Sequence, residues 1–403
     1  MPESAKDAAS PQSILQRMVR VVGHTLLRLI GNLFRSVEEP ATLRGKVWLY
    51  VVSQNNVDSL RFVQQRLPGS VLVAGQGKNI GKYEKEVARL SLRRKVLYYY
   101  KLPFLLLQFL RHKRASTLRF FDLLYDAIGF YEVYLQKLRR YQPAAVVFAN
   151  DHNADARAML LAAKALQIKT VYIQHASVSN LFPPLTFDLN LLEGQDSLDK
   201  YLQCGPVQGQ VALVGMPKAD AYVPFRNHST HIRTVGIGCN MMDDLQEVAG
   251  LLRKLSDAFP SLTFILRPHP RDTRNRSALT KIARNITISN GKEQHVFDYL
   301  KQLDVQISST SGIHLEAVLL NVWSIFYDFN PTQHLHDYYG FIQHGLVDVT
   351  GSAEELVQLL ATKLDTRPEV YHRARFYNAT VATPQDGKSG ELALKHICSL
   401  IKS

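Results

Sequence analysis

A histidine between two prolines is the strongest chemical signal in this sequence. Arg267, Pro268, His269 and Pro270 follow one another at the end of an apolar run, and Arg271 comes directly after them. Prolines restrict the backbone and cannot continue a hydrogen-bonded ladder, so the strand ends here with the imidazole at the rim of its sheet. Arginine and imidazole N–H groups suit a pyrophosphate. We therefore predict that Arg267, His269 and Arg271 bind the phosphates of a ligand.

A run of hydroxyl side chains at residues 308–311 leads into a predicted helix over 312–321. Such a turn offers side-chain oxygens and unpaired backbone N–H groups beside the positive end of the helix, although ordinary N-capping uses the same residues. A glutamate about one turn into the helix projects back towards this end and can accept hydrogen bonds from a ribose. The predicted nucleotide-binding residues here are Ser308, Ser309, Thr310, Ser311 and Glu316.

Three further candidates end predicted strands in the first half of the chain. His175 ends the strand 169–175, Asp151 follows the strand 144–150, and Glu193 lies at the end of the strand 188–194. An imidazole or a carboxylate at such a rim can take the proton of an attacking hydroxyl. We expect His175 to be this base, because its neutral form is available near pH 7 without a large pKa shift.

These residues need a parallel sheet to bring them together, and the sequence predicts two. Apolar runs of strand length alternate with helical segments along most of the chain, and functional groups gather at the carboxyl ends of parallel strands. The fold class is α/β: two doubly wound, Rossmann-like domains facing a cleft, with an extra basic helical segment at the N-terminus. The predicted parts are an amphipathic helix in 1–40, an α/β domain over 41–215 with a basic aromatic helical insert at 82–140, a linker at 216–233, a nucleotide-binding α/β domain over 234–380 and a C-terminal helix in 381–403.

Charge points to an anionic partner. The chain has 403 residues and a formal net charge of +13, and no nucleic-acid-binding module is visible in it. Residues 14–34 are apolar but interrupted by arginines, which disfavours a membrane span and a signal peptide. This helix lies either on an anionic membrane or against its own domain. Residues 82–119, with 11 Lys and Arg against two Glu, form either a helical pair with solvated cations or a membrane contact, for which Arg93, Arg94 and Lys95 are candidates.

The motifs QHAS, VGMPKAD, ILRPHPRD, SSTSGIHLEAV and DGKSGE occur in this order. Their order resembles the GT-B glycosyltransferases of bacterial surface polysaccharide synthesis, notably CDP-glycerol glycerophosphotransferases and capsule polysialyl- and Kdo-transferases, over roughly residues 145–400. The resemblance implies that His269, Ser308 and Ser309 contact the donor, and that His175 matches a catalytic His-Gly histidine, although Ala176 replaces the glycine. Polysialyltransferases carry an acidic pair before a glycine, where this chain has only Glu193.

The resemblance implies transfer of a sugar or polyol phosphate from a nucleotide-activated donor, cytidine-linked in the most similar families. The acceptor would be a surface polysaccharide or a lipid-linked glycan at the cytoplasmic face of the membrane. UDP-sugar 2-epimerases share the architecture and are the alternative, as is a non-catalytic, membrane-associated nucleotide-binding protein. No second acid stands beside Glu316, which favours transfer. We expect no metal or other cofactor, because neither the three cysteines nor His334, His336 and His344 have metal-ligand spacing.

Overall fold

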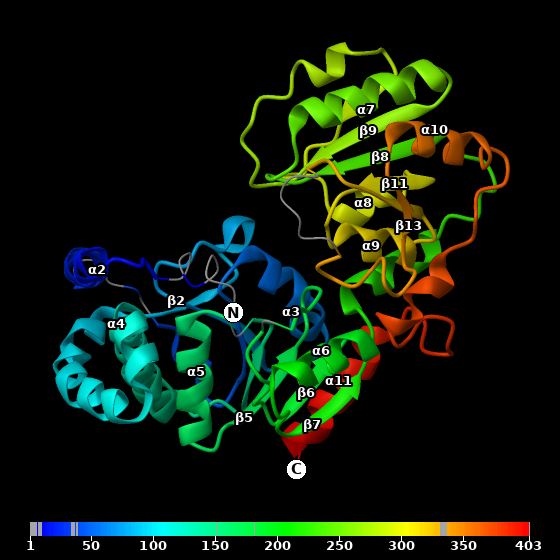
Figure 1. The fold of residues 1–403 in the computed structure, drawn as a ribbon. Coiled ribbons are helices and arrows are strands. Elements are labelled where there is room, and N and C mark those ends of the chain that lie inside the picture. The colour runs from blue at the N-terminus through cyan, green and yellow to red at the C-terminus, as the bar shows by residue number, and fades with distance from the viewer. Residues whose placement is uncertain are drawn as a thin grey trace.

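The chain folds into two α/β units, each built on one parallel sheet (Figure 1). The computed structural model describes residues 6, 10–33, 37, 39–150, 152–180, 182–330 and 337–402. The first sheet has seven strands in the order β3-β2-β1-β4-β5-β6-β7, and the second has six in the order β10-β9-β8-β11-β12-β13. All pairings are parallel. The predicted α/β class with two doubly wound domains is confirmed.

The first sheet is buried in its centre because its strands are continuous apolar runs rather than alternating ones, as is typical of a sheet covered on both faces. Strands β1 and β4, for example, are buried along their whole length. Its strands are β1 (Val47–Tyr50), β2 (Ser70–Gly75), β3 (Ala88–Leu90), β4 (Ala145–Phe148), β5 (Lys169–Ile173), β6 (Leu189–Leu192) and β7 (Gln210–Leu213). The helices that follow these strands are α3 (Gln54–Arg66), α5 (Ala154–Ala165) and α6 (Gln195–Cys204).

The second sheet repeats the design with shorter connecting helices. Its strands are β8 (Thr234–Cys239), β9 (Thr263–Pro268), β10 (Ile286–Ile288), β11 (Val305–Ser308), β12 (Trp323–Tyr327) and β13 (Asp348–Thr350), with α7 (Leu245–Ala258), α8 (Val296–Leu300), α9 (Ile313–Leu319) and α10 (Ala353–Ala361) between and after them. Asp244 caps α7 and Ser352 caps α10 through side-chain hydrogen bonds, which satisfy otherwise unpaired N–H groups of the first turns.

The chain crosses between the two units twice. The 3₁₀ helix η4 (Pro217–Phe225) leads out of the first unit, and α11 (Ser389–Lys402) returns to it, where Ala393 and Ile397 join the core under the first sheet. Arg226 makes a two-pronged ion pair with Asp386 at 2.6 and 2.9 Å and so ties the two crossings together. Helix α11 packs against β5 and β6 of the first unit (Figure 1).

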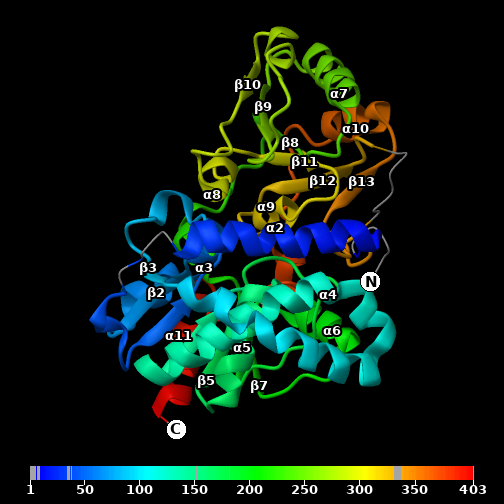
Figure 2. The same cartoon turned by 90° about the vertical axis from the view of Figure 1, so that its left-hand side faces the viewer.

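The N-terminal helix and the insert form a separate layer on the outside of the first unit (Figure 2). It contains α2 (Ile14–Leu33), the 3₁₀ helix η3 (Arg93–Lys101) and α4 (Leu102–Tyr141), which leaves helical geometry at Lys113 and Phe120. Lys95 is not a surface cation: it is 1% exposed, pairs with Asp126 and lies over the ring of Phe130. In the described ranges, no helix combines the length and the apolarity needed to cross a bilayer. The remaining 3₁₀ helices are η1 (Ala41–Leu43), η2 (Gly81–Tyr83), η5 (Leu279–Lys281) and η6 (Tyr371–Phe376).

Candidate functional site

A cavity of about 380 Å³ lies where the carboxyl ends of the two sheets face each other. Both units and the connector between them supply its walls. The first unit contributes Asn55, His175, Ala176 and Ser177; the connector contributes Met216 and Lys218; the second unit contributes Gly238, Cys239, Asn240, Arg267, Pro268, His269, Pro270, Val296, Ser309, Ser311, Gly312, Ile313, Glu316 and Tyr339. Six of the predicted site residues thus come together in one cavity: His175, Arg267, His269, Ser309, Ser311 and Glu316.

His269 presents one N–H group to its surroundings. Its backbone N–H donates to the carbonyl of Cys239 at 2.8 Å, and its Nδ1 accepts the backbone N–H of Arg271 at 3.2 Å. Burial, together with the positive charge of Arg271, lowers the pKa of this histidine. A neutral imidazole that accepts at Nδ1 carries its proton on Nε2. The rim histidine is therefore a hydrogen-bond donor of fixed tautomer, which suits a phosphate oxygen.

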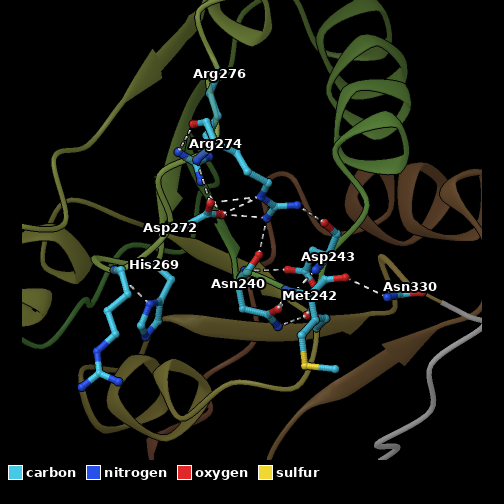
Figure 3. A network of polar contacts seen from close by, with 10 residues as sticks. Asn240, Met242, Asp243, His269, Asp272, Arg274, Arg276 and Asn330 are labelled. Carbon is cyan, nitrogen blue, oxygen red and sulfur yellow. Dashed lines mark hydrogen bonds and ion pairs between the residues drawn. The ribbon is translucent and has the colours of Figure 1, made fainter. Parts of the chain in front are cut away.

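Most of the neighbouring arginines are used within the protein (Figure 3). Arg274 holds Asp272 and also donates to the carbonyls of Asp243 and Asn240, at 2.7 Å each. These bonds tie the loop after β9 to the loop after β8. The Arg274 guanidinium, with Arg276, holds the pKa of the Asp272 carboxyl well below its usual range.

Arg267 likewise donates to Ser289 at 2.7 Å and to the carbonyl of Gln294 at 2.8 Å. It lines the cavity while its donors are partly occupied, so its main contribution is a positive charge in the wall. Arg271 lies beside the cavity rather than in its wall and is exposed.

The four hydroxyl residues divide into two groups. Ser309 and Ser311 line the cavity, whereas Ser308 is 1% exposed and accepts a hydrogen bond from Gln306 inside the second unit. Thr310 faces a separate small cavity near Tyr338. Alternate strand residues point to opposite faces, so neighbours at the end of β11 could not all reach one ligand.

Ser309 is positioned by side chains that the sequence did not single out. Its hydroxyl donates to Asp243 at 2.6 Å and accepts from Asn240 at 3.0 Å. The buried His314 contacts the Ser309 carbonyl at 2.9 Å and the Ser324 hydroxyl at 2.7 Å. The signal for His314 was present in the SSTSGIHLEAV motif, but its distance from the rim could not be read from spacing.

Lys218 is the functional candidate that sequence reasoning missed. It lies in η4, and its ammonium pairs with Glu316 at 2.6 Å in the cavity wall. Burial acts to lower the pKa of Lys218, but the carboxyls of Glu316 and Glu193 raise it above its usual value. Lys218 therefore stays charged between Glu193 of the first unit and Glu316 of the second. Its only sequence signal was its place in the VGMPKAD motif.

His175 lines the same cavity as His269, in the part contributed by the first unit. Its Nδ1 is buried and makes no hydrogen bond within the described structure. Burial, together with electrostatic repulsion from His152 and Lys218, lowers the pKa of His175 to about 3. The expectation of an ordinary pKa is therefore wrong: the imidazole is neutral, and its basicity is low. Asp151, the neighbouring candidate, lies outside the described residues.

Glu193 stands behind the cavity wall rather than in it. It is 2% exposed, its Oε2 accepts from Gln174 at 3.2 Å, and its backbone N–H donates to the same Gln174 side chain at 2.9 Å. Gln174 also donates to the carbonyl of Ala176 at 3.0 Å. Burial raises the pKa of Glu193 to about 8, with Lys218 opposing the shift and Glu316 adding to it. This carboxyl is mostly protonated at neutral pH and buttresses the turn that carries His175.

The two units touch beside the cavity. The Tyr338 hydroxyl donates to Ser179 at 2.9 Å, and the Lys200 ammonium donates to the carbonyl of Tyr339 at 2.7 Å. A Cβ placed on Gly312 would lie 4.0 Å from the Ser177 hydroxyl. The start of α9 in the second unit therefore lies within van der Waals reach of the loop that follows His175. Within the described ranges, no three His, Cys, Asp or Glu side chains lie together as metal ligands would.

Several solved structures have an architecture similar to that of this chain. No protein-family model and no curated protein matches the chain. The UDP-GlcNAc 2-epimerase of Neisseria meningitidis is 14% identical, with 88% of this chain and 100% of the other covered and a TM-score of 0.57. The wall teichoic acid polymerase TagF is 12% identical over 96% and 97% of the two chains, with a TM-score of 0.53. The calicheamicin glycosyltransferase CalG4 is 11% identical over 89% and 98%, with a TM-score of 0.56. At these identities the likeness shows the GT-B fold and no closer kinship.

Proposed function

We propose that this protein is a GT-B glycosyltransferase, or a polyol-phosphate transferase, that uses a nucleotide-activated donor. The observation that carries the proposal is the cavity itself, which is lined by His269 and Glu316 of the second unit and by His175 of the first. A two-sided site of this kind suits a displacement, in which the leaving group and the nucleophile approach one atom from opposite faces. The solved structures compared above are named as a UDP-GlcNAc 2-epimerase, a wall teichoic acid polymerase with CDPG and a calicheamicin glycosyltransferase.

The donor would lie against the second unit. His269 Nε2–H and the positive charge of Arg267 would neutralise its phosphates, with Ser309 and Ser311 beside them, and Glu316 would accept from the ribose hydroxyls. One Glu316 oxygen pairs with Lys218, which leaves the other for the ribose. Cytidine donors are favoured because the resembling families use them.

The acceptor would approach from the first unit. Its hydroxyl oxygen would attack the donor carbon or phosphorus, its proton would pass to the His175 imidazole, and the bond to the leaving phosphate would break with the negative charge held by His269. The anionic donor raises the low pKa of His175 by its nearby charge, so the base becomes competent when the donor is bound. The acceptor proposed is a surface polysaccharide or a lipid-linked glycan, at the cytoplasmic face of the membrane.

Epimerisation is the second candidate, since several structures of the same fold are UDP-GlcNAc 2-epimerases. Epimerisation needs no acceptor, whereas transfer does. The test therefore measures consumption of CMP-, CDP- and UDP-linked donors with and without added glycan acceptors. Consumption that yields an epimer without any acceptor would replace the proposal, and nucleotide binding without turnover of any donor would leave a binding protein.

Variants then assign the base. Removal of a general base typically lowers turnover by about 10²- to 10⁴-fold while donor affinity changes little. We expect this of His175→Ala, with Asp151→Asn and Glu193→Gln measured in parallel. His228→Ala is the matched control, since this exposed histidine of the connector region does not line the cavity. If a carboxylate variant loses turnover and His175→Ala keeps it, that carboxylate is the base.

A further inference from the structure

The polar side of the N-terminal helix α2 faces the protein. Arg17 is 4% exposed and donates to the carbonyl of Arg119 at 3.0 Å, and Arg20 pairs with the buried Asp122 at 3.4 Å. The Thr25 hydroxyl contacts that of Tyr125 on the same side. A surface helix of a globular protein normally turns its apolar stripe to the core and its charges to water. Helix α2 does the reverse.

Its outer side is a continuous apolar stripe. Seven apolar side chains recur along the helix every three to four residues, some of them as adjacent pairs, and each is between 52 and 72% exposed. They are Ile14, Leu15, Met18, Val19, Val22, Leu26 and Ile30. The neighbouring η3 and the first part of α4 add exposed apolar side chains, namely Leu97, Tyr100, Phe104 and Leu107. We call these eleven residues the apolar face. Figure 2 shows α2 lying along the outside of the molecule, next to the layer of α4. Exposed apolar patches of this extent mark interaction sites.

The segments that form the apolar face are rich in cations. Residues 10–33 contain three Lys and Arg, and residues 87–121 contain nine; neither range contains an Asp or a Glu. Arg93, Arg94, Arg111, Lys113 and Arg114 are exposed. We propose that the apolar face docks on a bilayer of anionic lipid, with these cations at the headgroups and the α2 stripe inserted below them. A second copy of the chain fits less well, because a symmetric contact would bring the like charges together.

Vesicle binding of the full chain tests this proposal without any nucleotide, so its failure leaves the proposed function standing. The probes are vesicles of phosphatidylcholine with phosphatidylglycerol, and of phosphatidylcholine alone. The variant Met18→Gln, Val22→Gln, Leu26→Gln removes apolar area from the middle of the stripe and keeps good helix formers. The matched control is Leu161→Gln, Leu202→Gln, Phe225→Gln, which alters three residues of similar exposure away from this face.

We expect the stripe variant to bind the anionic vesicles on the order of 100-fold more weakly, given the area removed, and the control to bind as wild type. Neutralising Arg93, Arg94 and Arg111 to Gln should weaken binding by about five-fold per cation at low salt, and added salt should erase this difference. Equal binding by the stripe variant and its control overturns the proposal. So does wild-type self-association without vesicles that the stripe variant abolishes, because the face would then be a protein interface.

Discussion

Replacing Glu193 by glutamine should make the protein more stable at neutral and alkaline pH, although the change alters a residue of the predicted site. The carboxyl is 2% exposed, and burial raises its pKa from 4.5 to about 8. Between pH 4.5 and about pH 8, the Glu193 carboxyl is protonated in the folded chain and ionised in the unfolded chain. The stability that this group contributes is therefore complete below pH 4.5 and is lost as the pH rises through 8.

The size of the effect follows from the shift. Each pKa unit corresponds to about 1.4 kcal/mol, so a shift from 4.5 to about 8 costs wild type about 5 kcal/mol at high pH. At pH 7 the same linkage gives about 3 kcal/mol, and at pH 5 less than about 1 kcal/mol. Glutamine is neutral at every pH and keeps an oxygen for the Gln174 amide. The Glu193→Gln variant should therefore not lose this free energy of unfolding as the pH rises.

Calorimetry of wild type and variant at about pH 5, 7 and 9 measures the difference. For a domain of this size, about 3 kcal/mol raises the melting temperature by roughly 6 to 12 °C at pH 7, and the gain should shrink to about 2 °C at pH 5. Glu293→Gln, at an exposed carboxyl, should shift the melting temperature little at any pH. A gain that does not change with pH, or a variant less stable than wild type at pH 9, would refute the reasoning that Glu193 is held neutral.

The remaining predictions concern the second unit and the connector. His269→Ala should weaken nucleotide binding by about 10- to 150-fold, the worth of one charge-assisted hydrogen bond, and unchanged calorimetric affinity for every nucleotide that binds wild type would contradict its phosphate role. Glu316→Gln should reduce the preference for ribonucleotides over deoxyribonucleotides; an equal loss for both would point to helix destabilisation. Lys218→Met should destabilise the protein by about 3 kcal/mol at neutral pH because it leaves Glu316 unpaired, and adding Glu316→Gln should recover most of this in a double-mutant cycle; additive effects would mean that the pair is uncoupled.

The two parallel sheets could be predicted from sequence because buried parallel strands are uninterrupted apolar runs. The predicted strand 144–150, for example, contains β4, whose four residues are all apolar. The edge strands β3 and β13 were missed, since three residues with exposed or half-exposed positions carry little pattern. The equally short edge strand β10 was predicted, around Ile286.

The rim histidines could be found from sequence because a strand end fixes where a side chain starts. Their surroundings could not, since burial and partners come from segments distant in the chain. His175 lost its ordinary pKa to burial and to Lys218, which lies 43 residues further on. Ser308 and Ser309 are adjacent in sequence, yet one is held inside the second unit and the other lines the cavity.

The connector also belongs to the candidate site, because its helix η4 carries Lys218. Residue 218 of η4 reaches Glu316 of the second unit at 2.6 Å, while two positions later Asp220 accepts the N–H groups of Ser389 and Gly390 at 3.0 and 2.7 Å, at the start of α11. One short helix thus contacts the proposed ribose-binding residue on one side and the returning helix of the first unit on the other. A change in the spacing of the two units would move η4 and with it the Lys218 ammonium, whose pKa is raised by Glu316 and Glu193. If the donor binds at Glu316 as proposed, its binding and the charge around the proposed base should be coupled through η4, because Lys218 pairs with Glu316 and also acts on the pKa of His175.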